Sequence, residues 1–246
     1  MEINKIIGKG NTAEVYEYGE NKVIKLFHTG FSISAIKNEY NNAMVVKDLP
    51  FNKALVYDLI SYKGRKGIVY DKVEGELLLD WVLRIKDVVK CASYMKKLHS
   101  EILKNKVSGV PSYKSFLSEF ISKVKIDDNI KKEAFAKLEM LEDGDVLCHG
   151  DFHPGNIFVD KNEELYVIDF MNVCHGNILY DIARTVFLVE YTPVPENVPD
   201  YEMLILFKKK LSELYLIGMG VTKEQIQDYL DLIIIARKAE CPNEHL

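Results

Sequence analysis

Short apolar runs of strand length dominate the first third of the chain. Two of them flank a glycine-rich segment at residues 8–10, and a third carries Lys25 between apolar neighbours. Residues 54–59 and 67–70 form two more such runs, and the polar stretch 61–66 between them predicts a β-hairpin. A helical stretch at residues 32–46 separates the third run from the fourth. This part of the sequence therefore predicts a small sheet with a helix.

The apolar positions change to helical spacing from residue 80 onward. In residues 80–103 they recur three and four positions apart, which predicts one amphipathic helix that Asp80 or a neighbour could cap. Further helices are predicted at residues 111–125, 128–141, 180–190, 201–217 and 222–238. Thr222 with Gln225 three positions later forms a capping box at the last of these. Strands followed by helices indicate an α+β protein.

The chemistry lies between the helices, in H-G-D-F-H-P-G-N at residues 149–156 and I-D-F at residues 168–170. Asn156 and Asp169 follow Asp151 by 5 and 18 residues. Phosphoryl transfer from ATP needs such a set, because one carboxylate orients the attacking hydroxyl while an amide and a second carboxylate hold Mg²⁺. The order and spacing match those of protein kinases, with H-G-D in place of H-R-D and D-F-M in place of D-F-G.

These residues resemble the aminoglycoside phosphotransferase and choline kinase family of small-molecule kinases, which uses H-G-D-x-x-x-x-N and then I-D-[FW]. A further family pattern, G-x-x-x-Y-D-[LI]-A, reads G-N-I-L-Y-D-I-A at residues 176–183, and the resemblance is unbroken over residues 146–184. It implies a bilobal protein-kinase-like fold. We expect a small β-rich N-lobe at residues 1–74 and a mainly helical C-lobe, with the catalytic loop and acceptor site, at residues 75–246.

The glycine segment reads G-x-G-x-x-A, and glycine lets backbone N–H groups approach phosphate oxygens. Followed by a strand ending in V-I-K, it resembles the kinase glycine loop, so Gly8, Gly10 and Lys25 are expected to bind ATP. A kinase lysine needs a glutamate from the next helix. Glu39 is the acidic residue available between Glu20 and Asp48, and it shares a helix face with apolar neighbours.

The resemblance also implies the remaining roles. Asp151 would orient the acceptor hydroxyl and take its proton, and Asn156 and Asp169 would hold Mg²⁺ through hard oxygen ligands. The backbone of Asp71 and Val73 would bind the adenine, by their position after the fifth strand. His149 and Asp181 would support the catalytic loop rather than react, and His99 is expected to be a packed structural histidine.

Composition limits the function classes. The chain has 246 residues, which suits one bilobal unit, and 48% hydrophobic residues suffice for a sizeable core. A net charge of −5 and a pI of about 5.8 argue against a nucleic-acid partner. No signal peptide and no apolar run of about 18 residues are visible, so neither secretion nor a membrane helix is expected. Four cysteines without a C-x-x-C pair suggest reduced thiols and a cytoplasmic protein.

The favoured function is an ATP- and Mg-dependent kinase of a small-molecule hydroxyl, in an amino sugar, an amino alcohol or a related metabolite. An atypical protein kinase is one alternative, but the 12 residues from Asp169 to Asp181 leave no room for a long activation loop. A nucleotide-binding scaffold without turnover is another. A zinc hydrolase site built from Cys148, His153 and His175 with their neighbours is conceivable, but the spacing fits no usual zinc pattern.

The sequence does not identify the acceptor. The family places its pocket among the C-terminal helices, so seven acidic residues are candidates for its wall, and no single one is favoured. They are Glu190, Asp200, Glu202, Glu213, Asp228, Asp231 and Glu240. ATP and GTP cannot be distinguished either, because hinge contacts are mainly made by the backbone, and the oligomeric state is not indicated.

Overall fold

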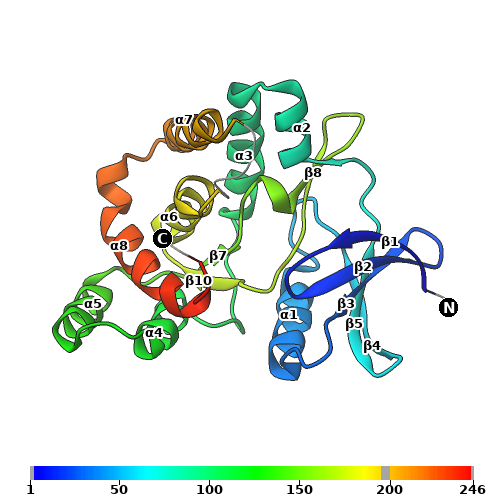
Figure 1. Cartoon of the computed structure of the whole chain (residues 1–246), viewed down its shortest axis with the longest axis horizontal. Helices are drawn as coiled ribbons and strands as arrows, with labels where there is room; N and C mark the ends of the chain where they lie inside the picture. Colours follow the sequence, from blue (N-terminus) through cyan, green and yellow to red (C-terminus); the bar gives the residue numbers. More distant parts are fainter. Residues whose placement is uncertain (1–2, 195–199, 245–246) are drawn as a thin grey trace.

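A computed structural model describes residues 3–194 and 200–244 of the chain. Its N-terminal part is an antiparallel five-stranded sheet in the order β1-β2-β3-β5-β4 (Figure 1). The strands are β1 (Ile3–Lys9), β2 (Ala13–Tyr18), β3 (Lys22–Phe27), β4 (Val56–Tyr62) and β5 (Arg65–Asp71). Helix α1 (Ile33–Val46) contacts β4 and β5, and Ser32 caps it by accepting from the N–H of Ala35. The predicted sheet with a helix is confirmed.

The hairpin between β4 and β5 is tighter than its sequence suggested. The polar stretch 61–66 was expected to be the turn, but the turn is confined to Lys63 and Gly64, whose φ angles are 47° and 81°. Two residues with positive φ match the right-handed twist of the flanking strands. The rest of the polar stretch is strand, because Ser61 pairs with Lys66 and Tyr62 pairs with Arg65. The side chain of Arg65 also donates to the backbone carbonyls of Phe27 and Leu26 at 2.7 and 2.8 Å.

The remaining chain is mainly helical, as predicted. It comprises α2 (Leu78–Ile85), α3 (Val88–Ile102), α4 (Tyr113–Lys123), α5 (Asp128–Met140), α6 (Ile178–Val186), α7 (Tyr201–Met219) and α8 (Lys223–Glu240). A π-helical turn, η2 (Phe187–Tyr191), extends α6. The capping box of Thr222 and Gln225 is present at the start of α8. None of the helices in the described ranges is both long and apolar enough to cross a membrane.

The single helix predicted at residues 80–103 is wrong, because two helices occupy this stretch. Lys86 ends α2 in the left-handed conformation with φ of 62°. Asp87 then starts α3, since its carboxylate accepts from the N–H of Lys90 at 2.9 Å. Asp80, the expected cap, lies in the first turn of α2 instead. The helical spacing of apolar residues continues across the break at Lys86, so the sequence pattern did not reveal that Asp87 caps a second helix.

Short strands that the hydrophobic pattern did not predict carry the candidate catalytic segments. β7 (Val146–Cys148) pairs with β10 (Cys174–Gly176), and β8 (Ile157–Val159) lies between β6 (Glu76–Leu77) and β9 (Leu165–Val167). A 3₁₀ turn, η1 (Pro154–Asn156), precedes β8. These two small sheets lie between the five-stranded sheet and the helices (Figure 1). Residues 149–156 follow the end of β7, and residues 168–170 follow the end of β9, so the strands fix the position of both segments.

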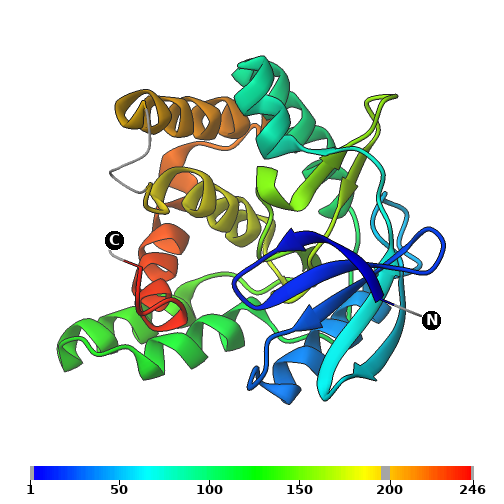
Figure 2. The same cartoon turned by 45° about the vertical axis from the view of Figure 1, so that its right-hand side comes forward.

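One apolar core runs through the molecule, from Ala13 and Phe27 in the sheet to Ala236 in α8. α7 packs on α3, and α8 packs on α4 and α6, so the helices form one packed group beside the sheet (Figure 2). A smaller apolar cluster of Ile24, Leu26 and Val69 covers the other face of the large sheet. The α+β class is confirmed, and the boundary between residues 74 and 75 stays a prediction.

Candidate active site

Lys25 of β3 connects three parts of the fold. Its ammonium lies 2.9 Å and 3.0 Å from the two carboxylate oxygens of Glu39 on α1, and 3.0 Å from Oδ2 of Asp169. The hydroxyl of Tyr70 on β5 donates to Glu39 at 3.1 Å, and Glu39 is completely buried. The structure thus contains the expected Lys25–Glu39 ion pair and joins it to the Asp169 turn.

Burial and charge act in opposite directions on this group. Burial raises the pKa of Glu39 to about 7, although the ammonium of Lys25 acts against the shift. Burial alone would lower the pKa of Lys25, but the carboxylates of Asp169 and Glu39 outweigh it, so the lysine pKa is raised. Burial would raise the pKa of Asp169, yet Lys25 keeps it below its usual value. The ammonium is therefore fixed in the charged form beside Asp169.

The Asp169 turn explains one departure from the protein-kinase pattern. Asp169 has φ of 68°, an uncommon conformation for a residue other than glycine, whereas Met171 is not among the residues with positive φ. A glycine is therefore not required at the third position of this D-F-M turn. The amide of Asn42 on α1 donates to the carbonyls of Phe170 and Met171 at 3.1 and 3.2 Å. α1 thus positions both Glu39 and the turn.

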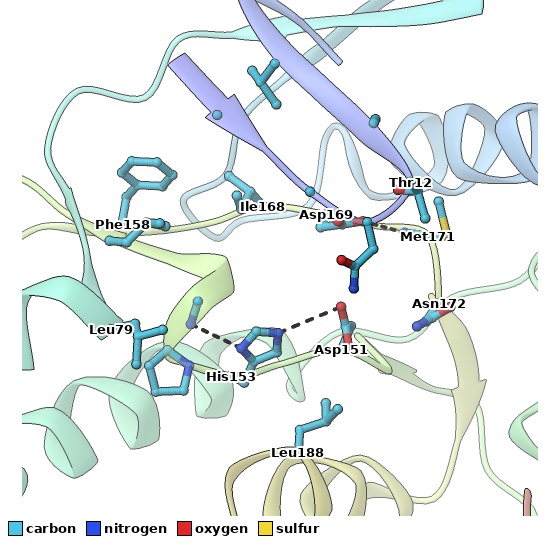
Figure 3. Close-up of a pocket in the computed structure, with 18 of the residues that line it drawn as sticks. Thr12, Leu79, Asp151, His153, Phe158, Ile168, Asp169, Met171, Asn172 and Leu188 are labelled. Carbon is cyan, nitrogen blue, oxygen red and sulfur yellow. Dashed lines mark hydrogen bonds and ion pairs between the residues drawn. The ribbon is translucent and has the colours of Figure 1, made fainter. Parts of the chain in front are cut away.

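Asp151 lies at the start of the loop that leads to Asn156. The side-chain amide of Asn156 donates to the backbone carbonyl and to Oδ2 of Asp151, at 2.9 Å each. The backbone carbonyl of Asn156 accepts from the N–H of Ile168 at 3.0 Å, which brings the neighbouring Asp169 to the same place. Nε2 of His153 lies 3.9 Å from Oδ2 of Asp151 (Figure 3). The three residues predicted from spacing are thus brought together.

His149 fixes the loop from inside. It is buried, and burial lowers its pKa. Its Nδ1 accepts from the N–H of Asp151 at 3.2 Å, and its Nε2 lies 3.2 Å from the carbonyl of Ile168. The first contact requires an unprotonated Nδ1, so the neutral ring with its proton on Nε2 satisfies both. This ring links the two chemical segments, as expected for a supporting residue.

Asp181 on α6 holds the loop from behind. Its completely buried carboxylate accepts from the backbone N–H groups of His149 and Gly150 at 2.7 and 2.8 Å, and Nε2 of His99 lies 2.9 Å away. Burial would raise the pKa of Asp181, but its hydrogen bonds and the nearby histidines lower it. Nδ1 of His99 contacts the hydroxyl of Tyr215 on α7 at 2.5 Å. The sequence patterns did not point to Tyr215.

The glycine of H-G-D, the second departure, is required by space. Gly150 has φ of 74°, and a Cβ placed there would lie 2.2 Å from the carbonyl oxygen of Asn172. An arginine cannot occupy this position without moving the backbone. Arg184 on α6 reaches the loop instead, and its Nε donates to the carbonyl of Gly150 at 3.0 Å. Arg184 is completely buried, and the sequence analysis missed it.

A cleft of about 1080 Å³ opens between the sheet and the helices. Most of the predicted site residues line it, namely Gly8, Gly10, Lys25, Glu39, Asp71, Val73, Asp151 and Asp169. Asn156, His149 and Asp181 lie behind its wall, where they contact Asp151 or its loop. The N–H of Asp71 is already bonded to the carbonyl of Leu55 at 2.9 Å, so it is not available to an adenine.

The donor set is compatible with a magnesium ion held together with phosphates. The amide nitrogen of Asn156 is used by Asp151, which leaves its Oδ1 as a hard ligand, and the side chain of Asp169 is 30% exposed. Mg²⁺ is usually bound by one or two protein oxygens, waters and substrate phosphates. Within residues 3–194 and 200–244, no group of three histidine, cysteine or acidic side chains could hold a metal, so the zinc alternative gains no support.

Comparisons with known proteins agree with this fold. The profile of the phosphotransferase enzyme family matches residues 123–202. Amicoumacin kinase, solved with AMP-PNP and Ca²⁺, superimposes with a TM-score of 0.62 at 18% identity, over 97% of this chain and 80% of the other. Aminoglycoside-3'-phosphotransferase of type VIII does so with a TM-score of 0.65 at 16% identity, over 95% and 93%. No curated protein sequence matches the chain.

A third structure, aminoglycoside phosphotransferase APH(3'')-Id from Streptomyces rimosus, has a TM-score of 0.62 at 14% identity, over 94% of this chain and 92% of the other. The resemblance to the aminoglycoside phosphotransferase family and the bilobal protein-kinase-like fold are confirmed. The family profile over residues 123–202 also agrees with the predicted enzyme class, a phosphotransferase. The roles of the individual residues stay predictions.

Replacing Asp181 with alanine should destabilise the protein by roughly 3 kcal/mol or more, because buried N–H groups of the loop lose their acceptor. Urea unfolding followed by circular dichroism measures this change. The control is Asp145→Ala, which removes an exposed ion pair with Lys106 and should leave the urea midpoint nearly unchanged. Equal losses in both variants would contradict the supporting role of Asp181.

Gly150→Ala should impair folding or displace the catalytic loop, because the new Cβ clashes with the backbone of Asn172. Gly109→Ala is a matched control, since Gly109 has φ of 81° but nothing within 4 Å of its Cβ position. In the control, only the strain of an alanine in the left-handed conformation should lower the free energy of unfolding, by about 1–2 kcal/mol. Thermal unfolding of both proteins tests the difference, and similar melting temperatures would argue against the close approach.

Proposed function

We propose that this protein transfers the γ-phosphoryl group of ATP, or of GTP, to a hydroxyl of a small molecule in a magnesium-dependent reaction. The observation that carries the proposal is the placement of Lys25, with its two carboxylate partners, in the same cleft as Asp151. A phosphate-binding cation and a carboxylate poised for a hydroxyl are the two groups that phosphoryl transfer requires at close range.

The nucleotide would lie under β1 and β2. Lys25, positioned by Glu39, would bind the α- and β-phosphates, and the backbone at Gly8 and Gly10 would cover them. Backbone groups near Asp71 and Val73 would bind the base, with the N–H of Asp71 excluded. Mg²⁺, held by Asn156 and Asp169, would neutralise charge on the phosphates. Positioning and charge neutralisation account for most of the catalysis in such reactions.

Asp151 would orient the acceptor hydroxyl and take its proton. The amide of Asn156 bonds to Oδ2, so this contact fixes the rotation of the carboxylate and leaves Oδ1 to the acceptor. Arg184 would act as a positioning residue, through the carbonyl of Gly150. The predicted ATP-binding scaffold without turnover would not need this arrangement around Asp151.

Three further observations bear on the proposal. The chain passes from the Asp169 turn through β10 to α6, which starts at Ile178, so a protein substrate would find no activation segment of the kind protein kinases use. The four cysteines are free, in keeping with the predicted cytoplasmic location. The structures similar to this chain include complexes with streptomycin and with hygromycin B, which makes small hydroxyl compounds the first acceptors to test.

Asp151→Ala should lower turnover by about 10²–10⁴-fold, because a positioned general base is lost, while the affinity for nucleotide stays nearly unchanged. Mg²⁺-dependent ADP production with a panel of hydroxyl acceptors, and titration with a fluorescent ATP analogue, measure the two quantities. Asp169→Ala should also lose Mg²⁺-dependent nucleotide binding. Wild-type turnover in Asp151→Ala would refute the assignment of the base.

A further inference from the structure

The cleft has a second half, on the far side of Asp151 from the sheet. Leu188 of η2 lies there, opposite the strands, and Leu79 and Leu188 are drawn on either side of His153 (Figure 3). Six apolar residues from three helical elements line this half, and we name them the acceptor wall. They are Phe120 of α4, Leu188 and Val189 of η2, and Leu204, Phe207 and Leu211 of α7.

The charged groups beside this wall leave little negative charge for a cation. Glu240 is the one of the seven acidic candidates that lines the cleft in the described part of the chain. Its carboxylate lies 2.5 Å from Nη2 of Arg184 and 3.1 Å from Nη1 of Arg237. Arg237 also donates to Glu244 at 2.6 and 2.9 Å, so two guanidinium groups and two carboxylates balance one another here. Lys208, whose ammonium donates to the carbonyl of Thr192, adds a positive charge to the same half of the cleft.

The other acidic candidates do not face the cleft. Glu190 is bonded to Lys223 and Ser212, both at 2.8 Å. Asp228 and Asp231 share Lys137, at 2.7 and 2.8 Å. The three remaining ones, Glu213, Asp200 and Glu202, do not line the cleft. The acidic residues that were candidates for the acceptor pocket are thus largely engaged in internal ion pairs or lie away from the cleft.

A polycationic acceptor would lose hydration in this half of the cleft and find little compensating charge apart from Asp151, which is costly. An apolar group, by contrast, would gain by covering the wall. Leu79 and Leu83 of α2 line the same cleft, and they are 42% and 46% exposed. They add exposed apolar surface to the same cleft, so a longer apolar group has further surface to cover.

We propose that the acceptor is an amphipathic hydroxyl compound. Its hydroxyl lies at Asp151, and its alkyl or aryl body lies on the acceptor wall. This inference rests on the proposed function and specifies its substrate class. It distinguishes this chain from an enzyme built for polycationic amino sugars, which would need free carboxylates where this chain has leucine and phenylalanine.

The test is a homologous series of 2-amino-1-alkanols, starting from ethanolamine, with kanamycin as the polycationic comparison. Binding to the full chain with Mg²⁺ and AMP-PNP is measured by calorimetry, so it does not depend on turnover. We expect the affinity to rise about fourfold per methylene until the wall is covered. The longest homologues should bind more tightly than kanamycin, and ADP production with ATP should follow the same order.

Variants locate the effect on the wall. Phe207→Ser and, in a separate protein, Leu79→Ser should each reduce the gain in affinity per added methylene. Ile217→Ser is the matched control, because Ile217 lies on α7 as Phe207 does but is 74% exposed and does not line the cleft. The control should retain the wild-type gain, and circular dichroism of each variant verifies that it is folded.

Constant or absent binding along the series, or tighter binding of kanamycin, would overturn the inference, whatever the turnover. The same gain in Phe207→Ser would overturn the assignment to the acceptor wall, and the same gain in Leu79→Ser would overturn its extension to α2. Failure of the proposed function has a different signature. In that case ADP production is the same in wild type and Asp151→Ala with every acceptor, even where the homologues bind.

Discussion

The contact of one ammonium with two carboxylates determines how the two parts of this protein meet. Lys25 belongs to the sheet, Glu39 to α1, and Asp169 to the turn that follows the small strands. A buried charge is stable only when it is paired and hydrogen-bonded, so each of the three needs the others. The sheet and the helical part are therefore held in one relative position by the same group that would bind the phosphates.

A second polar network supports the loop from the helical side. Asp181 accepts from the backbone N–H groups of His149 and Gly150, and Arg184, one helical turn later on α6, donates to the carbonyl of Gly150. The loop backbone is thus bonded on both its donor and its acceptor side. Polar groups this deeply buried are costly unless satisfied, so they favour a single loop conformation. That rigidity is what a carboxylate needs in order to orient a hydroxyl.

The chain uses its carboxylates for structure more than for binding in the C-terminal half. Glu240 is shared by Arg184 and Arg237, and Arg184 continues to the catalytic loop. An acidic residue at the acceptor side is therefore part of the support for Asp151 and is not free to receive a cation. The acceptor side is left with an apolar wall, which is the basis of the selectivity that we propose.

The sequence by itself determined the sheet, most of the helices, and the chemical residues of the catalytic loop and the Asp169 turn. Strand and helix periods, and fixed offsets within one short segment, are local properties that a sequence displays. It did not reveal the break at Lys86, the contribution of Arg184, or the pairing of Glu240. Those depend on which side chains meet across distant helices, and only the packing of α6 against α8 and the loop decides them. The same packing decided that the acceptor half is apolar, because it placed the acidic side chains in ion pairs or away from the cleft.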